Sequence, residues 1–208
     1  MIGLQRSREM VVSVSFFIIS GHGNTEENQK RLYYGKTDTG LSLEGKRQME
    51  QMAGFINEQD WDAVYVSPSG RTVESARILL PDSPVIKDSR LEERNFGIFE
   101  GKSYEEIRRE YPEESTEWEK DWMGYSIPGG ESFLEVQERT EAFAKELLAK
   151  EFEKVLIVSH KGTMIQLLLV LLGMDKKQYW KFTLEQERYS VIEISYGNSV
   201  LKALNQKV

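Results

Sequence analysis

The chain of 208 residues contains no cysteine. Disulfide bonds, thiolate nucleophiles and zinc sites built from cysteine are therefore excluded. A chain without cysteine is compatible with the reducing environment of the cytosol, so we expect a cytoplasmic protein.

Positive charge is also scarce. Lysine and arginine total 27 against 34 for aspartate and glutamate, which gives a formal net charge of −7. Proteins that bind nucleic acid normally carry a basic face that neutralises phosphates, so we expect no nucleic-acid partner. A small anionic ligand remains compatible with this composition, because a few local cations can bind phosphate within an acidic protein.

Long hydrophobic runs are absent as well. The apolar run at residues 11–19 follows Arg6 and Arg8 and so resembles a secretory signal, but it is short, contains two serines and leads into Gly-His-Gly. We interpret it as a buried strand. A second apolar run, residues 164–172, is too short to span a bilayer and fits a core helix, so we expect no membrane association.

Strand-like and helix-like hydrophobic patterns alternate along the chain. Strands are predicted at residues 11–20, 62–66, 84–87 and 155–159, helices at 43–58, 72–80, 131–150 and 163–172, and a closing hairpin at 189–195 and 200–204. This alternation predicts an α/β fold with a mostly parallel central sheet covered by helices on both faces, which is a three-layer α/β/α sandwich.

The stretch 101–130 differs from the rest of the chain, because it is acidic and rich in aromatic residues. We expect one domain over residues 1–208, with this stretch as an insertion over one end of the sheet. Trp118, Trp122 and Tyr125 form either a small core of the insertion, which we favour, or a surface that stacks on a flat base.

The chain has only two histidines, and each follows the end of a predicted strand. His22 and His160 should therefore lie together under the insertion, because ligands of open α/β sheets bind at the carboxyl ends of the strands. Gly23 and Gly162 lie close to them and would let backbone amides approach an anion. Ordinary hydrogen-bonded loop histidines are the alternative. A metal site is less favoured, because no HxH, HxxxH or HExxH spacing exists.

The sequence Gly21-His-Gly-Asn-Thr25 resembles the Arg-His-Gly-Glu/Gln-Thr signature of the histidine phosphatase superfamily, in its phosphoglycerate-mutase-like branch. Further segments resemble that family in the same order, namely residues 34–38, 41–45, 67–76, 91–101, 128–131 and 158–162. The resemblance covers roughly residues 12–204 and implies the phosphoglycerate-mutase-like form of the α/β/α sandwich.

The resemblance also implies catalytic roles that are chemically sensible for a phosphomonoester. His22 would attack phosphorus and form a phosphohistidine, while Arg71 would bind phosphate oxygens with its planar fork. His160, if protonated, would add positive charge. Glu93 would donate a proton to the leaving oxygen and then activate water. Its neighbour Glu92 is the alternative, but the register of the family favours Glu93.

The remaining site residues come from the same resemblance. Asn28 stands where the family has a phosphate-contacting asparagine, and Gly23 and Thr25 belong to the phosphate-binding signature. Arg94 and Tyr34 are expected to contact the rest of the substrate. Histidine and arginine can supply the required charge, so we expect neither a metal nor another cofactor.

One departure from the family bears on activity. Gly21 stands where the signature has an arginine, and the loss of one such donor typically lowers the rate by about 10²–10³. Lys161 replaces a glycine after the second histidine and can restore part of the phosphate-binding charge. Three alternatives remain: a weakened phosphatase, a phosphate-ester-binding relative with little turnover, and an enzyme compensated by Lys161 or another cation.

A phosphatase is favoured over a cofactor-dependent phosphoglycerate mutase. The insertion is compact, and Asn95-Phe96 stands where mutases usually have His-Tyr. Residues 33–38 and 182–204 most resemble the bacterial α-ribazole phosphatases, which act on a cobalamin lower-ligand nucleotide. The expected partner is therefore a small phosphomonoester, and the sequence does not indicate an oligomeric state.

Overall fold

The computed structural model describes residues 15–207 of the chain. Its strands are β1 (Ser15–Gly21), β2 (Ala63–Val66), β3 (Ile86–Lys87), β4 (Lys154–Ser159), β5 (Tyr189–Ser195) and β6 (Asn198–Gln206). Its α-helices are α1 (Glu26–Gln29), α2 (Leu43–Asn57), α3 (Gly70–Leu79), α4 (Tyr104–Glu110), α5 (Pro112–Lys120), α6 (Phe133–Leu148) and α7 (Lys161–Leu171). Short 3₁₀ helices are η1 (Ser89–Leu91), η2 (Gly97–Phe99) and η3 (Lys176–Lys181). The part of the first predicted strand before residue 15, with Arg6 and Arg8, lies outside the described residues.

The strands form one sheet in the order β3-β2-β4-β1-β5-β6. Strands β1 to β4 are parallel to their neighbours, whereas β5 runs antiparallel to β1 and β6 antiparallel to β5. The β5–β6 turn uses Tyr196 and Gly197, whose φ angles of 53° and 74° match the twist of a tight hairpin. The predicted hairpin and the mostly parallel sheet are thus confirmed.

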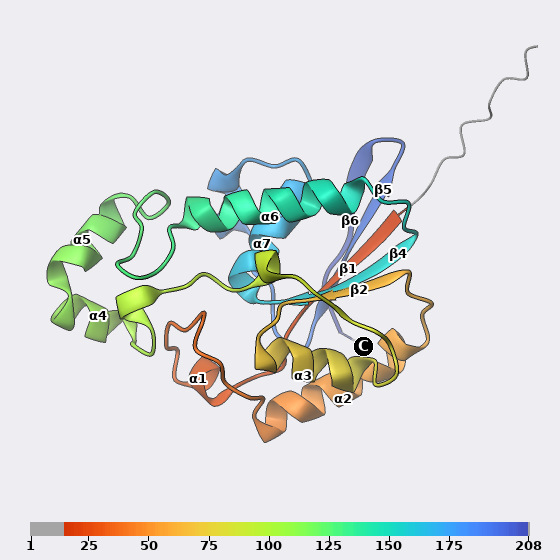
Figure 1. Ribbon diagram of the computed structural model, residues 1–208, viewed down its shortest axis with the longest axis horizontal. Coiled ribbons are helices and arrows are strands. Elements are labelled where there is room, and N and C mark those ends of the chain that lie inside the picture. Colours follow the sequence, from red (N-terminus) through yellow and green to blue (C-terminus); the bar gives the residue numbers. More distant parts are fainter. Residues whose placement is uncertain (1–14, 208) are drawn as a thin grey trace, which may run out of the picture.

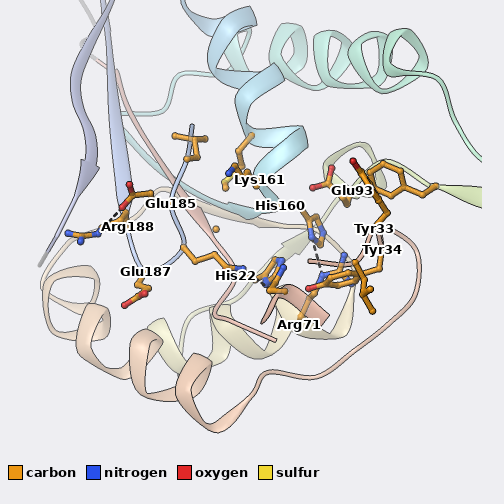
Figure 2. Close-up of a pocket in the computed structure, with 17 residues that line it drawn as sticks. His22, Tyr33, Tyr34, Arg71, Glu93, His160, Lys161, Glu185, Glu187 and Arg188 are labelled. Carbon is orange, nitrogen blue, oxygen red and sulfur yellow. Dashed lines mark hydrogen bonds and ion pairs between the residues drawn. The ribbon is translucent and has the colours of Figure 1, made fainter. Parts of the chain in front are cut away.

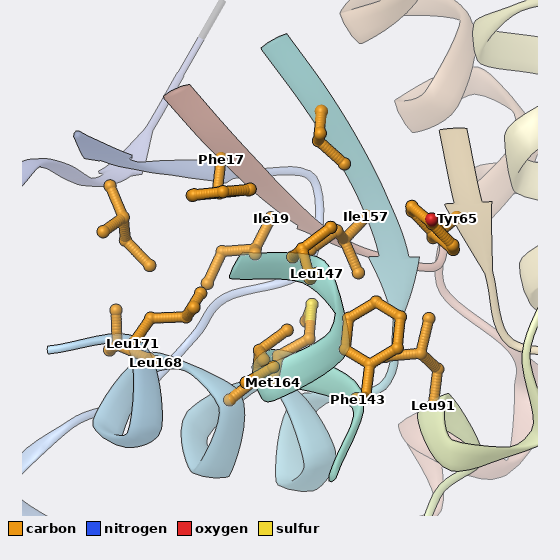
Figure 3. Packing of buried hydrophobic residues seen from close by; sticks show 14 of the residues in the cluster. Phe17, Ile19, Tyr65, Leu91, Phe143, Leu147, Ile157, Met164, Leu168 and Leu171 are labelled. Carbon is orange, nitrogen blue, oxygen red and sulfur yellow. The ribbon is translucent and has the colours of Figure 1, made fainter. Parts of the chain in front are cut away.

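Helices cover both faces of this sheet, as Figure 1 shows, with α6 and α7 on one face and α2 and α3 on the other. The alternation of side chains along a strand explains the two apolar layers. Phe17 and Ile157 belong to the cluster that packs against α6 and α7, whereas Ile18 and Leu156 belong to the cluster on the opposite face. Figure 3 shows the first cluster, in which Met164 of α7 lies close to the strand residues. The predicted three-layer α/β/α sandwich is confirmed.

The helices begin where side chains cap their free amides. Ser42 accepts from the amide of Gly45 at 3.0 Å and starts α2, and Ser132 forms a capping box with Glu135 at the start of α6. Helices α3 and α7 each begin two residues earlier than predicted. As a result, Arg71 and Lys161, which precede the predicted helices, lie in the first turn of a helix.

Residues 101–130 form α4, α5 and the turns that follow, beyond the carboxyl ends of the strands (Figure 1). Their core contains Ile107 and Ile127, with Trp118 and Tyr125 packed against it. This arrangement confirms the expected small core for two of the three aromatic residues. Trp122 lies elsewhere, against Phe133 at a ring distance of 4.8 Å.

Within residues 15–207, no helix combines the length and the apolar character needed to cross a bilayer.

Candidate active site

The two histidines meet because the strands that carry them are neighbours. Gly21 at the end of β1 pairs with Ser159 at the end of β4, and the amide of His22 donates to the carbonyl of Ser159 at 3.1 Å. The rings of His22 and His160 are consequently 5.2 Å apart. They line a cavity of about 490 Å³, together with Asn28, Tyr33, Tyr34, Arg71, Glu93, Phe96, Lys161 and residues 184–188. Figure 2 shows these side chains.

His22 has the protonation state of a nucleophile. Its side chain is 6% exposed, and its Nδ1 lies 2.7 Å from the carbonyl oxygen of Gly23. A carbonyl only accepts, so Nδ1 carries the proton and Nε2 keeps its lone pair. Burial, with a smaller contribution from the charge of Arg71, lowers the pKa of His22 to about 4. The ring is therefore neutral at pH 7, with the lone pair of Nε2 available.

His160 is neutral for a related reason. It is 1% exposed, and the Nε of Arg71 donates to its Nδ1 at 3.2 Å. Its Nε2 therefore carries the proton, which it donates to Ser67 Oγ at 2.8 Å. Burial, followed by the charge of Arg71, lowers the pKa of His160 well below its ordinary value. The positive charge that His160 would add if protonated is thus absent, because the ring is buried and accepts a hydrogen bond from the neighbouring guanidinium.

Arg71 provides the buried cation of the site. It is 1% exposed, and its two terminal nitrogens donate to the carbonyls of Thr37 at 2.9 Å and Gly35 at 2.7 Å. The guanidinium also lies over the ring of Tyr34, at 5.0 Å from the centroid. These contacts fix the guanidinium plane and leave one N–H on each terminal nitrogen for a ligand.

The carboxylate of Glu93 lies at the first turn of α7. It accepts from the amide of Gly162 at 3.0 Å and from the amide of Arg94 at 3.0 Å. The loop that carries it is held by Arg139 of α6, which donates to the carbonyl of Glu92 at 2.7 Å and to that of Glu93 at 3.2 Å. Glu93 lines the cavity and Glu92 does not, which favours Glu93 as the acid. Arg139 is a positioning residue for which the sequence carried no signal.

Asn28 is oriented as a donor toward the cavity. Its Oδ1 accepts from the amide of Thr25 at 3.1 Å and from Gln186 Nε2 at 2.7 Å. Because the backbone amide must donate, the amide group of Asn28 is fixed in this orientation, and its Nδ2 is left to donate. This geometry fits the predicted phosphate contact.

Two residues of the signature have structural roles instead of the predicted phosphate contact. The amide of Gly23 donates to Ser75 Oγ at 3.1 Å, and a Cβ at this position would lie 2.5 Å from the carbonyl oxygen of Gly45. Thr25 caps α1, and its Oγ1 is hydrogen bonded to the hydroxyl of Tyr34. Neither Gly23 nor Thr25 lines the cavity, since both are used to pack and orient the loop after His22.

The two residues predicted to contact the rest of the substrate, Tyr34 and Arg94, line different cavities. Tyr34 lines the cavity, and burial raises the pKa of its hydroxyl. Arg94 lines an adjoining cavity of about 480 Å³ instead. Its Nε donates to the carbonyl of Glu131 at 2.8 Å, which turns it away from His22, and burial lowers its pKa to about 10.

The structure has room for a side chain at position 21, where the family has an arginine. A Cβ on Gly21 would meet only the Cε of Met164, at 3.4 Å, which is ordinary contact. Gly21, Lys161 and Arg188 all line the cavity. Arg188 directly precedes β5, whose first residue, Tyr189, pairs with Ser20 of β1.

Arg188 was missed from the sequence, because only the register of the sheet brings it here. In Figure 2 it pairs loosely with Glu185, at 3.7 Å from Nε to Oε2.

Comparisons with known proteins agree with this geometry. Residues 17–207 match the histidine phosphatase superfamily (branch 1). Phosphoserine phosphatase 1 of Hydrogenobacter thermophilus is 31% identical over 191 residues, covering 90% of this chain and 90% of that protein. Adenosylcobalamin/alpha-ribazole phosphatase of Escherichia coli is 30% identical over 190 residues, covering 89% and 93%. The crystal structure of the alpha-ribazole phosphatase from Shigella flexneri superposes with a TM-score of 0.86 at 30% identity, over 92% of this chain and 96% of that one.

Proposed function

The chain belongs to the histidine phosphatase superfamily and is a phosphatase of that superfamily, and on this basis we propose that it hydrolyses phosphomonoesters through a phosphohistidine at His22. The observation that carries the proposal is the state of His22, whose Nδ1 is held protonated by a carbonyl while its Nε2 faces a cavity beside a buried arginine. The family, the likeness to α-ribazole phosphatases and the enzyme class predicted from the sequence are confirmed.

In the first step, Nε2 of His22 attacks phosphorus and the bond from phosphorus to the leaving oxygen breaks. Glu93 gives its proton to that oxygen, so the alcohol leaves neutral. The imidazole gains positive charge as the N–P bond forms, and the carbonyl of Gly23, at 2.7 Å from Nδ1, stabilises that charge.

In the second step, water attacks phosphorus and Glu93 takes a proton from it. The N–P bond breaks, inorganic phosphate leaves, and His22 returns to its neutral form. Glu93 therefore ends the cycle protonated, ready for the next substrate.

Charge stabilisation in both steps comes from fixed donors. Arg71 offers the two N–H groups that the backbone carbonyls leave free, and Asn28 offers Nδ2. Such donors act without reorganising, because their other hydrogen bonds already hold them in place. A phosphate dianion on Arg71 also favours protonation of His160, which would then add the charge that the ligand-free ring lacks.

Lys161 and Arg188 offset part of the loss at position 21. Lys161 lies at the amino end of α7, where the helix dipole already favours an anion, and it lines the cavity. Arg188 also lines the cavity, and its half-exposed pair with Glu185 is long enough to contribute little. We infer an enzyme that turns over slowly, and hold the non-catalytic phosphate-ester binder and the mutase as the competing functions.

The test is turnover of p-nitrophenyl phosphate by the whole chain and by its His22→Ala variant, with Asn57→Ala, an exposed position at the end of α2, as the control. We expect p-nitrophenolate release that disappears with His22→Ala and survives Asn57→Ala. Release that persists without the imidazole would overturn the proposal. Binding of inorganic phosphate without any turnover would favour the non-catalytic alternative, and transfer between phosphoglycerates would favour the mutase.

A further inference from the structure

The guanidinium of Arg71 is held by a loop that has no regular structure of its own. The two carbonyls that accept from its terminal nitrogens belong to Gly35 and Thr37. Both lie within residues 34–42, which form neither helix nor strand, and Thr37 is exposed. Loops without a hydrogen-bonded ladder are the more mobile parts of a protein. Another group must therefore fix the direction of these two carbonyls.

The carboxylate of Glu100 holds this loop from the side opposite to Arg71. Its Oε1 accepts from the amides of Gly35 at 2.9 Å and Lys36 at 3.2 Å, and its Oε2 accepts from the amide of Thr37 at 3.2 Å. The hydroxyl of Thr37 adds a fourth donor at 2.6 Å. Consecutive amides that converge on one anion form a nest. Because these amides are fixed on Glu100, the carbonyls of the same residues stay directed at the guanidinium.

Glu100 is itself firmly placed. It follows η2, whose Phe99 is fully buried in the core of the insertion. The amide of Phe96 donates to its Oε1 at 2.9 Å, and the amide of Gly101 donates to the carbonyl of Tyr33 at 2.7 Å. The carboxylate therefore joins the base of the insertion to the loop that holds the phosphate-binding arginine.

The charge of Glu100 also acts on Arg71. Burial alone would raise the pKa of Glu100, but the hydrogen bonds from Thr37, Phe96 and the loop amides outweigh burial and lower it. Glu100 is therefore ionised at pH 7. Burial lowers the pKa of Arg71, and Glu100 is one of the negative groups that oppose this shift. The carboxylate thus helps to keep a buried cation charged as well as oriented.

We propose that Glu100 is the positioning residue of Arg71: through the nest of residues 35–37 it directs two carbonyls at the guanidinium, and so sets the orientation in which the remaining N–H groups meet phosphate. This inference rests on the proposed phosphatase function, in which Arg71 binds the transferred phosphoryl group. The other anchor of the loop, Asp38, accepts from the amide of Gly70 at 2.7 Å and so fixes the start of α3 instead of the two carbonyls.

The test replaces Glu100 with glutamine, which has the same shape but no charge and only one accepting oxygen. We expect Glu100→Gln to lower kcat/KM for p-nitrophenyl phosphate by about tenfold, because a displaced donor loses part of its effect on the transition state. The matched control is Glu106→Gln, since Glu106 also accepts from a backbone amide, that of Ser103, but caps α4 in the insertion. It should change kcat/KM by less than about twofold. Equal losses from the two variants would overturn the proposal.

A double-mutant cycle with Arg71→Lys distinguishes positioning from a general effect on the fold. An ammonium has no planar fork to join the two carbonyls, so the direction of those carbonyls matters little to it. In this background, Glu100→Gln should lower kcat/KM by less than about twofold. A tenfold loss in both backgrounds would mean that Glu100 supports the fold in general, and would overturn the proposal.

Urea unfolding verifies that each variant is folded. If Glu100→Gln does not fold, Thr37→Val takes its place, because it removes only the hydroxyl that donates to Glu100 and keeps the carbonyl that faces Arg71. We expect Thr37→Val to lower kcat/KM about threefold with Arg71 present and to leave it unchanged in Arg71→Lys. Equal effects of Thr37→Val in both backgrounds would contradict the positioning role.

Binding of inorganic phosphate separates failure of this inference from failure of the proposed function. Calorimetry on the unaltered chain and on Glu100→Gln measures this affinity without turnover, and we expect Kd to rise about tenfold in the variant. That rise in a chain without turnover would retain the positioning role and reject the phosphatase function. Turnover with kcat/KM and Kd that Glu100→Gln leaves unchanged would retain the function and reject the positioning role.

Discussion

Restoring an arginine at position 21 should accelerate the enzyme, and the structure sets the expected size. The new side chain is accommodated, because its Cβ meets only the methyl of Met164 at 3.4 Å and opens on a cavity of about 490 Å³. A single transition-state donor is worth about 10²–10³ in rate. Lys161 lines the same cavity and is proposed to supply part of the charge, so we expect Gly21→Arg to raise kcat about 10²-fold, at the lower end of that range.

The assay is steady-state hydrolysis of p-nitrophenyl phosphate, with Gly21→Met as the matched control. Methionine fills similar space without charge, so it should leave kcat within about threefold or lower it. If Gly21→Met raised kcat as much as Gly21→Arg, the gain would come from filling the cavity and the electrostatic argument would fail.

The Gly21→Arg variant also serves to identify the cation that compensates for the arginine missing at position 21. Lys161→Met and Arg188→Gln are each measured with and without Gly21→Arg, as double-mutant cycles. A cation that offsets the missing arginine should matter about tenfold more when Gly21 is present. Equal effects in both backgrounds would show that neither residue takes over the role of the missing arginine.

Three further predictions concern the established pocket residues. Because the pKa of His22 falls from 6.5 unfolded to about 4 in the folded protein, the unfolded state binds more protons between these values. The free energy of unfolding should therefore fall by about 3 kcal/mol as the pH drops from 6.5 to 4, and urea unfolding measures it. If His22→Ala did not reduce this fall, His22 would not be its source. Glu93→Gln should lower kcat for ethyl phosphate, whose alcohol must be protonated as it leaves, by about 10²–10⁴. With p-nitrophenyl phosphate the same variant should keep a rapid first release of p-nitrophenolate, because this anion leaves without a proton. Stopped-flow absorbance measures this burst, and its loss would argue against Glu93 as the acid. Arg71→Lys should lower kcat/KM about 10²-fold, because an ammonium cannot replace the fork that joins two carbonyls, His160 and phosphate; an unchanged kcat/KM would exclude Arg71 from phosphate binding.

Much of the site was predictable because the sheet determines where strand ends meet. His22 and His160 each follow a hydrophobic strand, and parallel pairing of those strands brings their rings to 5.2 Å. The positions of Arg71 and Glu93 followed from family register, and the structure places both in the same cavity.

The parts that could not be predicted depend on side-chain direction and on long-range register. Gly23 and Thr25 belong to the signature, but only the approach of α2 and the hydroxyl of Tyr34 show that they pack instead of lining the cavity. Arg94 follows Glu93 directly, yet the carbonyl of Glu131 turns it into the adjoining cavity.

The protonation state of His160 also could not be predicted from the sequence. The sequence left open whether His160 is protonated, whereas the N–H that Arg71 donates to its Nδ1 at 3.2 Å requires a neutral ring. Arg188 has no motif of its own and reaches the cavity wall only because β5, which follows it, pairs with β1.

The most direct test of the mechanism is to trap the intermediate. The Glu93→Gln variant, which should form the intermediate from p-nitrophenyl phosphate but hydrolyse it slowly, is mixed with this substrate, quenched in alkali within the burst phase, digested and analysed by mass spectrometry, since phosphohistidine survives alkali better than acid. We expect a phosphoryl group on the peptide that contains His22 and none after His22→Ala. Turnover with no phosphorylated peptide, or with the phosphoryl group on His160, would contradict nucleophilic attack by His22.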